Sequence, residues 1–162
     1  MNSLDFAINM ETDGEKYYKE QAQKNKGNML EMIFNELAKD EKKHADILKN
    51  WGQKVKYDLK DSEITEKYKN VFAKESDFKS QIKSLPTQID AYELALKKEK
   101  ESIDLYTKML SEVIDNEDKK LFEFLVKEEK KHYEIFDEII NHLRKAEEWV
   151  ESPEFGLRKE EY

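Results

Sequence analysis

The sequence predicts an all-α protein, an antiparallel four-helix bundle built from two helical hairpins. Only 2 prolines and 4 glycines occur in 162 residues, and 41% of the residues are charged, a composition typical of long helices. The apolar residues recur at steps of three and four, the spacing of one helix face. The two halves also repeat each other. We therefore expect one domain over residues 1–150, followed by a C-terminal tail at 151–162.

Four long helices are expected, at residues 3–24, 29–51, 87–113 and 119–150. Ser3 is the expected N-cap of the first helix, and Gly52 is expected just past the end of the second. Turns are expected at 25–28 and 115–118. The 53–86 connection is too long for a turn, and a short helix is expected within it, at 64–73. Two short turns around one long crossover imply two hairpins.

An internal repeat supports this division. When the sequence is shifted by 88 residues, the stretch LAKDEKKH at 37–44 aligns with LVKEEKKH at 125–132. The same shift aligns Glu11 with Glu99 and Tyr18 with Tyr106. One offset serves both helices of each hairpin, so the fold should have approximate two-fold symmetry.

Each helix interrupts its apolar face with charged or polar groups. In the third long helix, Glu99 is the only charged member of a continuous face, which consists of Ile89, Tyr92, Leu96, Glu99, Ile103, Tyr106, Leu110 and Val113. The first helix carries Glu11 on its apolar face. The second and fourth helices each carry a Glu-x-x-His motif, in which both side chains share one face; these motifs are Glu41–His44 and Glu129–His132.

These groups should meet at one height in the bundle. In an antiparallel hairpin, the sequence positions of two facing residues average to the position of the turn. This average is 26 for Glu11 and Glu41, and 114 for Glu99 and Glu129. An unpaired buried carboxylate costs several kcal/mol, and a domain is stable by only about 5–15 kcal/mol. No Lys or Arg stands at these levels. The sequence therefore predicts two divalent cations in the core, held by a ligand set used in bundle-core di-iron and di-manganese proteins.

The sequence resembles the ferritin-like superfamily and, within it, the rubrerythrin-type di-iron domains. The resemblance covers about residues 3–150 and is carried by four fragments, AINMETDGEKYY, KDEKKHADIL, ALKKEKESIDLY and KEEKKHYEIF. It implies that the metal ligands are Glu11, Glu41, His44, Glu99, Glu129 and His132. It also implies that Glu41 and Glu129 bridge the two ions.

The resemblance further implies two iron ions, although imidazole and carboxylate ligands also suit manganese or zinc. The implied activity is an oxidoreductase that reduces hydrogen peroxide or dioxygen, which makes the chain a small peroxidase or a ferroxidase. The alternatives are a metal-binding or interaction bundle without turnover, and a protein for iron oxidation and storage.

Three features depart from the family pattern. The chain has no cysteine, so the rubredoxin iron site of full-length rubrerythrins is missing and a separate electron-donor protein is expected. Many rubrerythrins carry an extra carboxylate one turn after the third-helix ligand, where this chain has Ser102. Lys42 stands where a bacterioferritin has its haem-binding methionine, so no haem is expected.

Several residues near the predicted ligands have expected supporting roles. Helical side chains lean toward the N-terminus, so the hydroxyls of Tyr18 and Tyr106 should reach the metal site and hydrogen-bond its ligands. Asp40 and Glu128 each stand four residues before a histidine and either orient it or lie in solvent. His142 is expected on the surface.

Composition excludes several other functions. Without cysteine there are no disulfides, zinc-thiolate sites, iron–sulfur clusters or cysteine nucleophiles, and a net charge of -8 disfavours nucleic acid. No segment reads as a membrane span or a signal peptide, so a cytoplasmic location is expected. The 53–86 connection and the tail are candidates for a homodimer contact, and Trp149 and Phe155 are expected to cover either an end of the bundle or a dimer neighbour.

Overall fold

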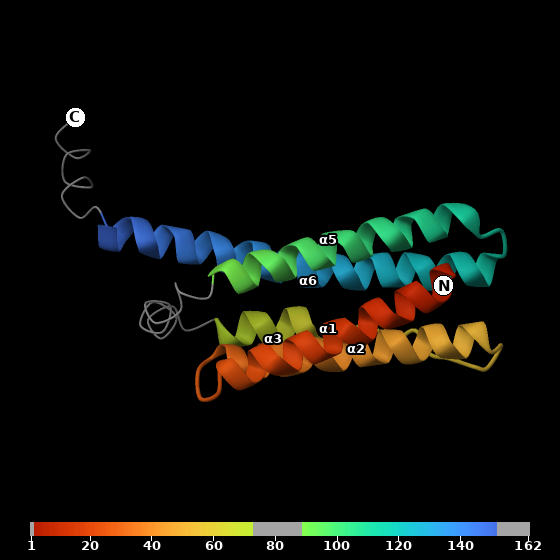
Figure 1. Cartoon of the computed structure of the whole chain (residues 1–162), viewed down its shortest axis with the longest axis horizontal. Coiled ribbons are helices and arrows are strands. Elements are labelled where there is room, and N and C mark those ends of the chain that lie inside the picture. The colour runs from red at the N-terminus through yellow and green to blue at the C-terminus, as the bar shows by residue number, and fades with distance from the viewer. Residues whose placement is uncertain (1, 73–88, 152–162) are drawn as a thin grey trace.

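The computed structural model describes residues 2–72 and 89–151 of the chain. These ranges contain five helices and no strand (Figure 1), namely α1 (Ser3–Lys24), α2 (Leu30–Gly52), α3 (Ile64–Val71), α5 (Ile89–Glu112) and α6 (Asn116–Glu151). The main chains approach most closely within the α1–α2 hairpin and within the α5–α6 hairpin. The predicted four-helix bundle of two hairpins is confirmed. No helix in the described ranges is long and apolar enough to cross a bilayer.

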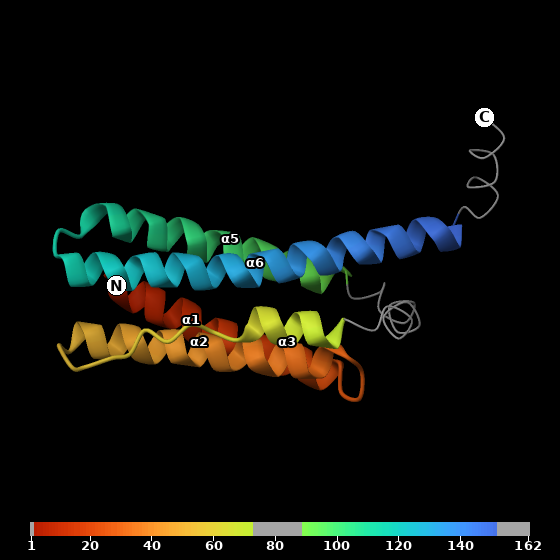
Figure 2. The same cartoon turned by 180° about the vertical axis from the view of Figure 1, so that it is seen from behind.

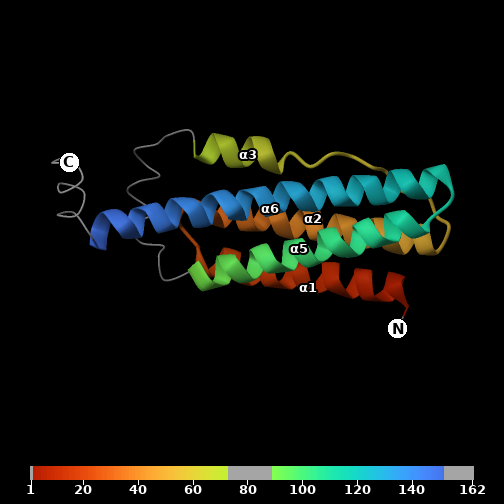
Figure 3. The same cartoon turned by 90° about the horizontal axis from the view of Figure 1, so that it is seen from above.

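The connection after α2 runs along the outside of the bundle and carries α3 back toward the α1–α2 turn (Figure 2). It lies on the face formed by α2 and α6, while α1 and α5 lie on the opposite side (Figure 3). Ile64 and Tyr68 of α3 are buried against the bundle. α3 ends at Val71, two residues before the predicted end at Ala73, and Ala73 lies outside the described residues. The predicted start of the third long helix, Thr87, also lies outside them.

The ends of the first hairpin differ from the predictions. Asn2, rather than Ser3, is the N-cap of α1, because its Oδ1 accepts a hydrogen bond of 2.8 Å from the Asp5 amide. Gly52 is the last residue of α2, and the positive φ of 58° falls at Lys54. A Cβ on Gly52 would lie 2.5 Å from a methyl carbon of Leu4. The glycine therefore serves close packing against α1.

The second turn is shorter than predicted. α6 begins at Asn116, three residues before the predicted Lys119, and the Lys119 amide already donates to the Asp115 carbonyl at 3.0 Å. The acidic residues that suggested a turn instead form the first helical turn, where negative charge is favoured by the helix dipole. These residues are Glu117 and Asp118.

The core consists of two apolar clusters separated by a polar layer. The cluster nearer the α1–α2 turn includes Tyr18, Phe34, Tyr92, Phe136 and Ile140. The cluster nearer the α5–α6 turn includes Ala7, Leu48, Tyr106, Phe122 and Leu125. Every predicted metal ligand has a sequence position between the residues that its helix contributes to these two clusters. The bundle therefore buries its charged groups between two apolar regions that limit the access of water.

Gly27 in the α1–α2 turn gives a test of the backbone. Its φ is +88° and no atom lies within 4 Å of where a Cβ would stand, so Gly27→Ala introduces strain without a clash. We expect a loss of about 1–2 kcal/mol in the free energy of unfolding, measured by chemical denaturation. The neighbouring exposed control Lys26→Ala should change it by no more than about 0.5 kcal/mol. Equal stability of the two variants would contradict this account of the turn.

Candidate metal centre

All six predicted ligand residues lie in the polar layer, and all are buried. α1 and α5 each place one glutamate there, and α2 and α6 each place a glutamate and a histidine one turn apart. The least buried of the six, Glu41, has only 4% of its surface exposed, and both histidines have 0%. The structure therefore brings together the whole set that the sequence singled out, which is Glu11, Glu41, His44, Glu99, Glu129 and His132.

The ligand atoms form two overlapping groups. One contains Glu11 and His44, the other contains Glu99 and His132, and both include Glu41 and Glu129. In each group the ligand atoms lie within 4.8 Å of one another. Each group could hold one metal ion, and the two shared carboxylates lie where they could contact both ions.

Both histidines direct Nδ1 at the carboxylates. His44 Nδ1 lies 2.8 Å from a Glu129 oxygen and 3.5 Å from a Glu11 oxygen. His132 Nδ1 lies 3.0 Å from a Glu41 oxygen and 3.3 Å from a Glu99 oxygen.

Several atoms of this layer lack a hydrogen-bond partner in the described part of the chain. They are Glu11 Oε2, Glu41 Oε1, Glu99 Oε2, Glu129 Oε2 and His132 Nδ1. Buried polar atoms are normally paired, and leaving one unpaired costs about 1–3 kcal/mol or more when it is charged. Carboxylate oxygens with imidazole nitrogens suit iron, manganese or zinc. The residues present therefore fit a pair of metal ions.

Two tyrosines link the hairpins at this layer. The Tyr106 hydroxyl donates a hydrogen bond of 2.5 Å to Glu11, and the Tyr18 hydroxyl donates to Glu99. Each tyrosine thus crosses to the other hairpin, where Tyr106 of α5 contacts the α1 glutamate and Tyr18 of α1 contacts the α5 glutamate. Burial and the adjacent glutamate raise the pKa of both phenols well above its usual value, so both remain donors. The sequence predicted their approach to the site but not which glutamate each one contacts.

Asp40 contacts a histidine, but not the one predicted. Its Oδ2 lies 2.9 Å from His132 Nε2, so the acid preceding the His44 motif contacts the histidine of the other hairpin. A carboxylate on the outer nitrogen of a histidine fixes the orientation of the ring. The same Asp40 oxygen accepts a hydrogen bond of 2.6 Å from the Ser62 hydroxyl of the crossover.

Glu128 differs from its counterpart Asp40. Its carboxylate accepts a hydrogen bond of 2.9 Å from the Ser62 amide and pairs with Lys131 at 2.8 Å, so its predicted alternatives, orienting His132 or lying in solvent, are both wrong. His44 Nε2 has no hydrogen-bond partner in the described ranges. Ser62 is not among the predicted site residues, because nothing in the sequence links the crossover to the two Glu-x-x-His motifs. His142 is exposed, as predicted.

Burial and mutual repulsion shift the pKa values of the layer in opposite directions. Burial, then the charges of neighbouring glutamates, raise the pKa of Glu41 and Glu129 well above 4.5. Burial also acts to raise the pKa of Glu11, but the adjacent Glu41 carboxyl, the adjacent His44 and the hydrogen bond from Tyr106 lower it to about 2. Burial acts to lower the pKa of His132, but Glu99, Asp40 and Glu129 raise it well above 6.5. Glu41, Glu129 and His132 therefore keep their protons to higher pH in the metal-free layer than isolated carboxyl and imidazole groups do, and metal binding would displace such protons.

The fold and this layer define a class of protein: ferritin-like four-helix bundles whose core carries carboxylates and histidines suited to two metal ions. A comparison with protein-family models then identifies the family. The rubrerythrin model matches residues 2–140, so the chain belongs to the rubrerythrin family, and the resemblance seen in the sequence is confirmed. Searches of the curated proteins and of the solved structures gave no significant match.

The raised pKa values predict how the metal-free protein responds to pH. A group whose pKa is higher in the folded state stabilises that state at low pH, and this contribution is lost as pH rises. The loss begins above 4.5 for Glu41 and Glu129 and above 6.5 for His132. In the presence of a chelator, the midpoint temperature of thermal unfolding, measured by circular dichroism, should decrease as the pH is raised from about 5 to about 8.

A double variant tests the source of that slope. Glu41→Gln together with Glu129→Gln removes two of the titrating groups, so the fall in the midpoint with pH should become shallower. A midpoint of the metal-free protein that rises steadily over the same range would contradict the assignment of retained protons to this layer.

Proposed function

We propose that Glu11, Glu41, His44, Glu99, Glu129 and His132 hold two iron ions and that the protein reduces hydrogen peroxide or dioxygen. One observation carries the proposal: two buried groups of three carboxylates and one histidine share Glu41 and Glu129. A carboxylate common to both groups suits a bridge between ions. Membership of the rubrerythrin family, a family of ferritin-like di-iron domains, supports iron over manganese or zinc.

When bound, the iron pair supplies two electrons to the oxidant. The chain supplies the surroundings. Tyr18 and Tyr106 donate hydrogen bonds to the terminal glutamates and hold their carboxylates in position. The two apolar clusters limit the access of water to the site from the two ends of the bundle. The 162 residues contain no cysteine to hold an iron-thiolate centre, and a separate electron-donor protein is part of this proposal.

Stopped-flow oxidation tests the proposed activity. Protein loaded with ferrous iron without air should be oxidised by peroxide or dioxygen faster than free ferrous iron at the same concentration. Elemental analysis of protein grown without added metal identifies the resident ion. An unchanged oxidation rate in a protein that does bind metal would favour the alternative without turnover. Elution of a large cage in sizing chromatography would favour iron storage.

The shared glutamates give a sharper prediction. Glu129→Gln removes a carboxylate from both groups, so the metal content should fall from about two ions per chain to fewer than one. Glu99→Gln removes a ligand from the His132 group alone and should leave about one ion bound. Metal content after dialysis measures both variants. An equal loss in the two variants would contradict the bridging role of Glu129.

The hydrogen bond between Asp40 and His132 predicts that the two ions bind unequally. Asp40→Asn removes the negative charge that lies beside Nε2 of His132. The affinity of the group that contains Glu99 and His132 for a metal ion should therefore fall roughly 10–100-fold. The His44 group, which has no such partner, should change little. Ser62→Ala should act in the same direction but less strongly, since it only loosens Asp40.

Titration with ferrous or zinc ions, followed by calorimetry, measures both affinities. The exposed Asp46→Asn on the same helix is the matched control, because its carboxylate pairs only with exposed Lys42 in the described contacts. Two equal affinities that Asp40→Asn leaves unchanged would contradict the prediction.

A further inference from the structure

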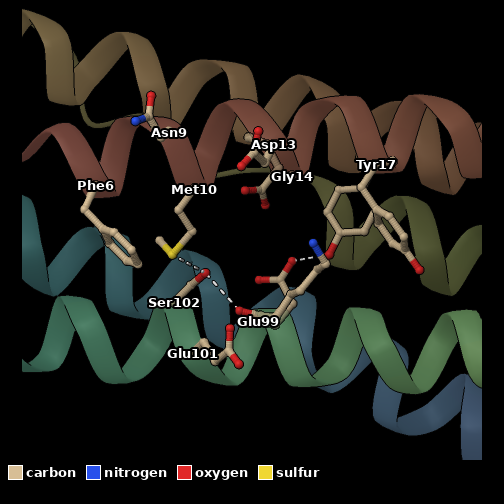
Figure 4. A pocket seen from close by; sticks show the side chains of 12 residues that line it. Phe6, Asn9, Met10, Asp13, Gly14, Tyr17, Glu99, Glu101 and Ser102 are labelled. Carbon is tan, nitrogen blue, oxygen red and sulfur yellow. Dashed lines mark hydrogen bonds between the residues drawn. The ribbon is translucent and has the colours of Figure 1, made fainter. Parts of the chain in front are cut away.

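A cavity of about 360 Å³ lies between α1 and α5 and reaches the metal layer (Figure 4). Buried carboxylates of Glu41 and Glu99 form its inner end. Its outer rim consists of exposed residues, namely Phe6, Asn9, Asp13 and Glu101. The described part of the connection, residues 53–63, and α3 lie on the opposite face of the bundle, so among the described residues this cavity connects the surface to the candidate ligands on the other face.

Two small residues keep the cavity open next to the carboxylates. Gly14 and Ser102 occupy equivalent positions of the internal repeat, each one turn beyond a predicted ligand of its helix. A Cβ on Gly14 would lie 3.0 Å from a Glu41 oxygen. The Ser102 hydroxyl lies 3.0 Å from the carbonyl oxygen of Lys98 on its own helix and 3.4 Å from Met10 Sδ on α1 (Figure 4), so Ser102 packs against the Met10 wall of the cavity. Neither side chain therefore fills the space in front of Glu41 and Glu99.

The size and lining of the cavity suit a small organic molecule. A water-sized molecule occupies about 30 Å³, so hydrogen peroxide would fill only a small part of it. Pockets for organic ligands begin at about 300 Å³ and combine apolar walls with a few polar groups. Met10 and Tyr17 supply apolar wall (Figure 4), and Phe6 at the rim is 53% exposed. These side chains would shield the apolar part of an organic ligand from water.

The charges at the rim favour a neutral ligand. Asp13 and Glu101 are negative, and among the described residues Lys98 is the only basic side chain that lines the cavity. The Lys98 ammonium lies 5.1 Å from the centre of the Tyr17 ring, where a cation–π contact engages it. The whole chain carries a net charge of -8, which repels anions.

We propose that this cavity binds a neutral organic hydroperoxide, with its apolar group against Phe6, Met10 and Tyr17 and its peroxide end toward Glu41 and Glu99. This inference rests on the proposed function and names a substrate class for it. Reduction of the hydroperoxide breaks its O–O bond, consumes two electrons and two protons, and yields one alcohol and one water. An iron pair held by the six candidate ligands would supply the two electrons.

A binding experiment tests the cavity without any turnover. The probe is 2-phenyl-2-propanol, the alcohol formed from cumene hydroperoxide, added to metal-free protein and followed by NMR chemical shifts. The alcohol should shift resonances of the cavity residues. Ser102→Phe and Met10→Trp, each placing a large side chain in the cavity, should weaken binding about tenfold or more. Ser111→Phe, at an exposed position of the same helix, should bind as the unmodified protein does.

Stopped-flow rates then separate the inference from the proposed function. The ratio of the oxidation rate with cumene hydroperoxide to that with hydrogen peroxide should fall about tenfold or more in Ser102→Phe and Met10→Trp, and should stay unchanged in Ser111→Phe. If the alcohol does not bind, or binds equally to all variants, the inference is overturned. If hydrogen peroxide oxidises the loaded protein but cumene hydroperoxide does not, the inference fails alone. If neither does, the proposed function fails.

Discussion

The repulsion among four buried carboxylates is the constraint on which the rest of this structure depends. Glu11, Glu41, Glu99 and Glu129 lie in one layer with almost no exposed surface, and no Lys or Arg reaches them in the described contacts. Moving a charge out of water costs several kcal/mol even after relaxation, a large share of the stability of a whole domain. In the metal-free state retained protons relieve this repulsion. Two cations would relieve it more completely, so metal binding and folding should be coupled.

The layer also joins the two hairpins. The Tyr18 and Tyr106 hydroxyls and the Asp40 carboxylate each contact a predicted ligand of the opposite hairpin. Within one hairpin, a glutamate and a histidine are correctly placed but their hydrogen-bonding partners are absent. The site is therefore complete only after the hairpins pack together. Its geometry depends on contacts between residues 81 to 95 positions apart in sequence.

A single crossover makes this nearly symmetric bundle unequal. The repeat offers equivalent acids, Asp40 and Glu128, to the two histidines, but one connection can lie only on one face. Its Ser62 contacts both acids, through the hydroxyl to Asp40 and through the amide to Glu128. Asp40 reaches a histidine and Glu128 does not. The cavity between α1 and α5 forms on the face opposite Ser62 and α3.

The sequence by itself determined the helices and the six candidate ligands, because helical spacing and the 88-residue repeat can both be recognised from the order of the residues alone. It misplaced some helix ends, where Asn2 and Asp118 can serve either in a turn or in a helix terminus. Only the tertiary structure decided that Asp40 contacts His132, that the Ser62 hydroxyl donates a hydrogen bond to Asp40, and that a cavity forms beside Gly14. Those outcomes depend on how the hairpins and the crossover pack in space, and a linear pattern does not encode which of two equivalent partners lies within reach.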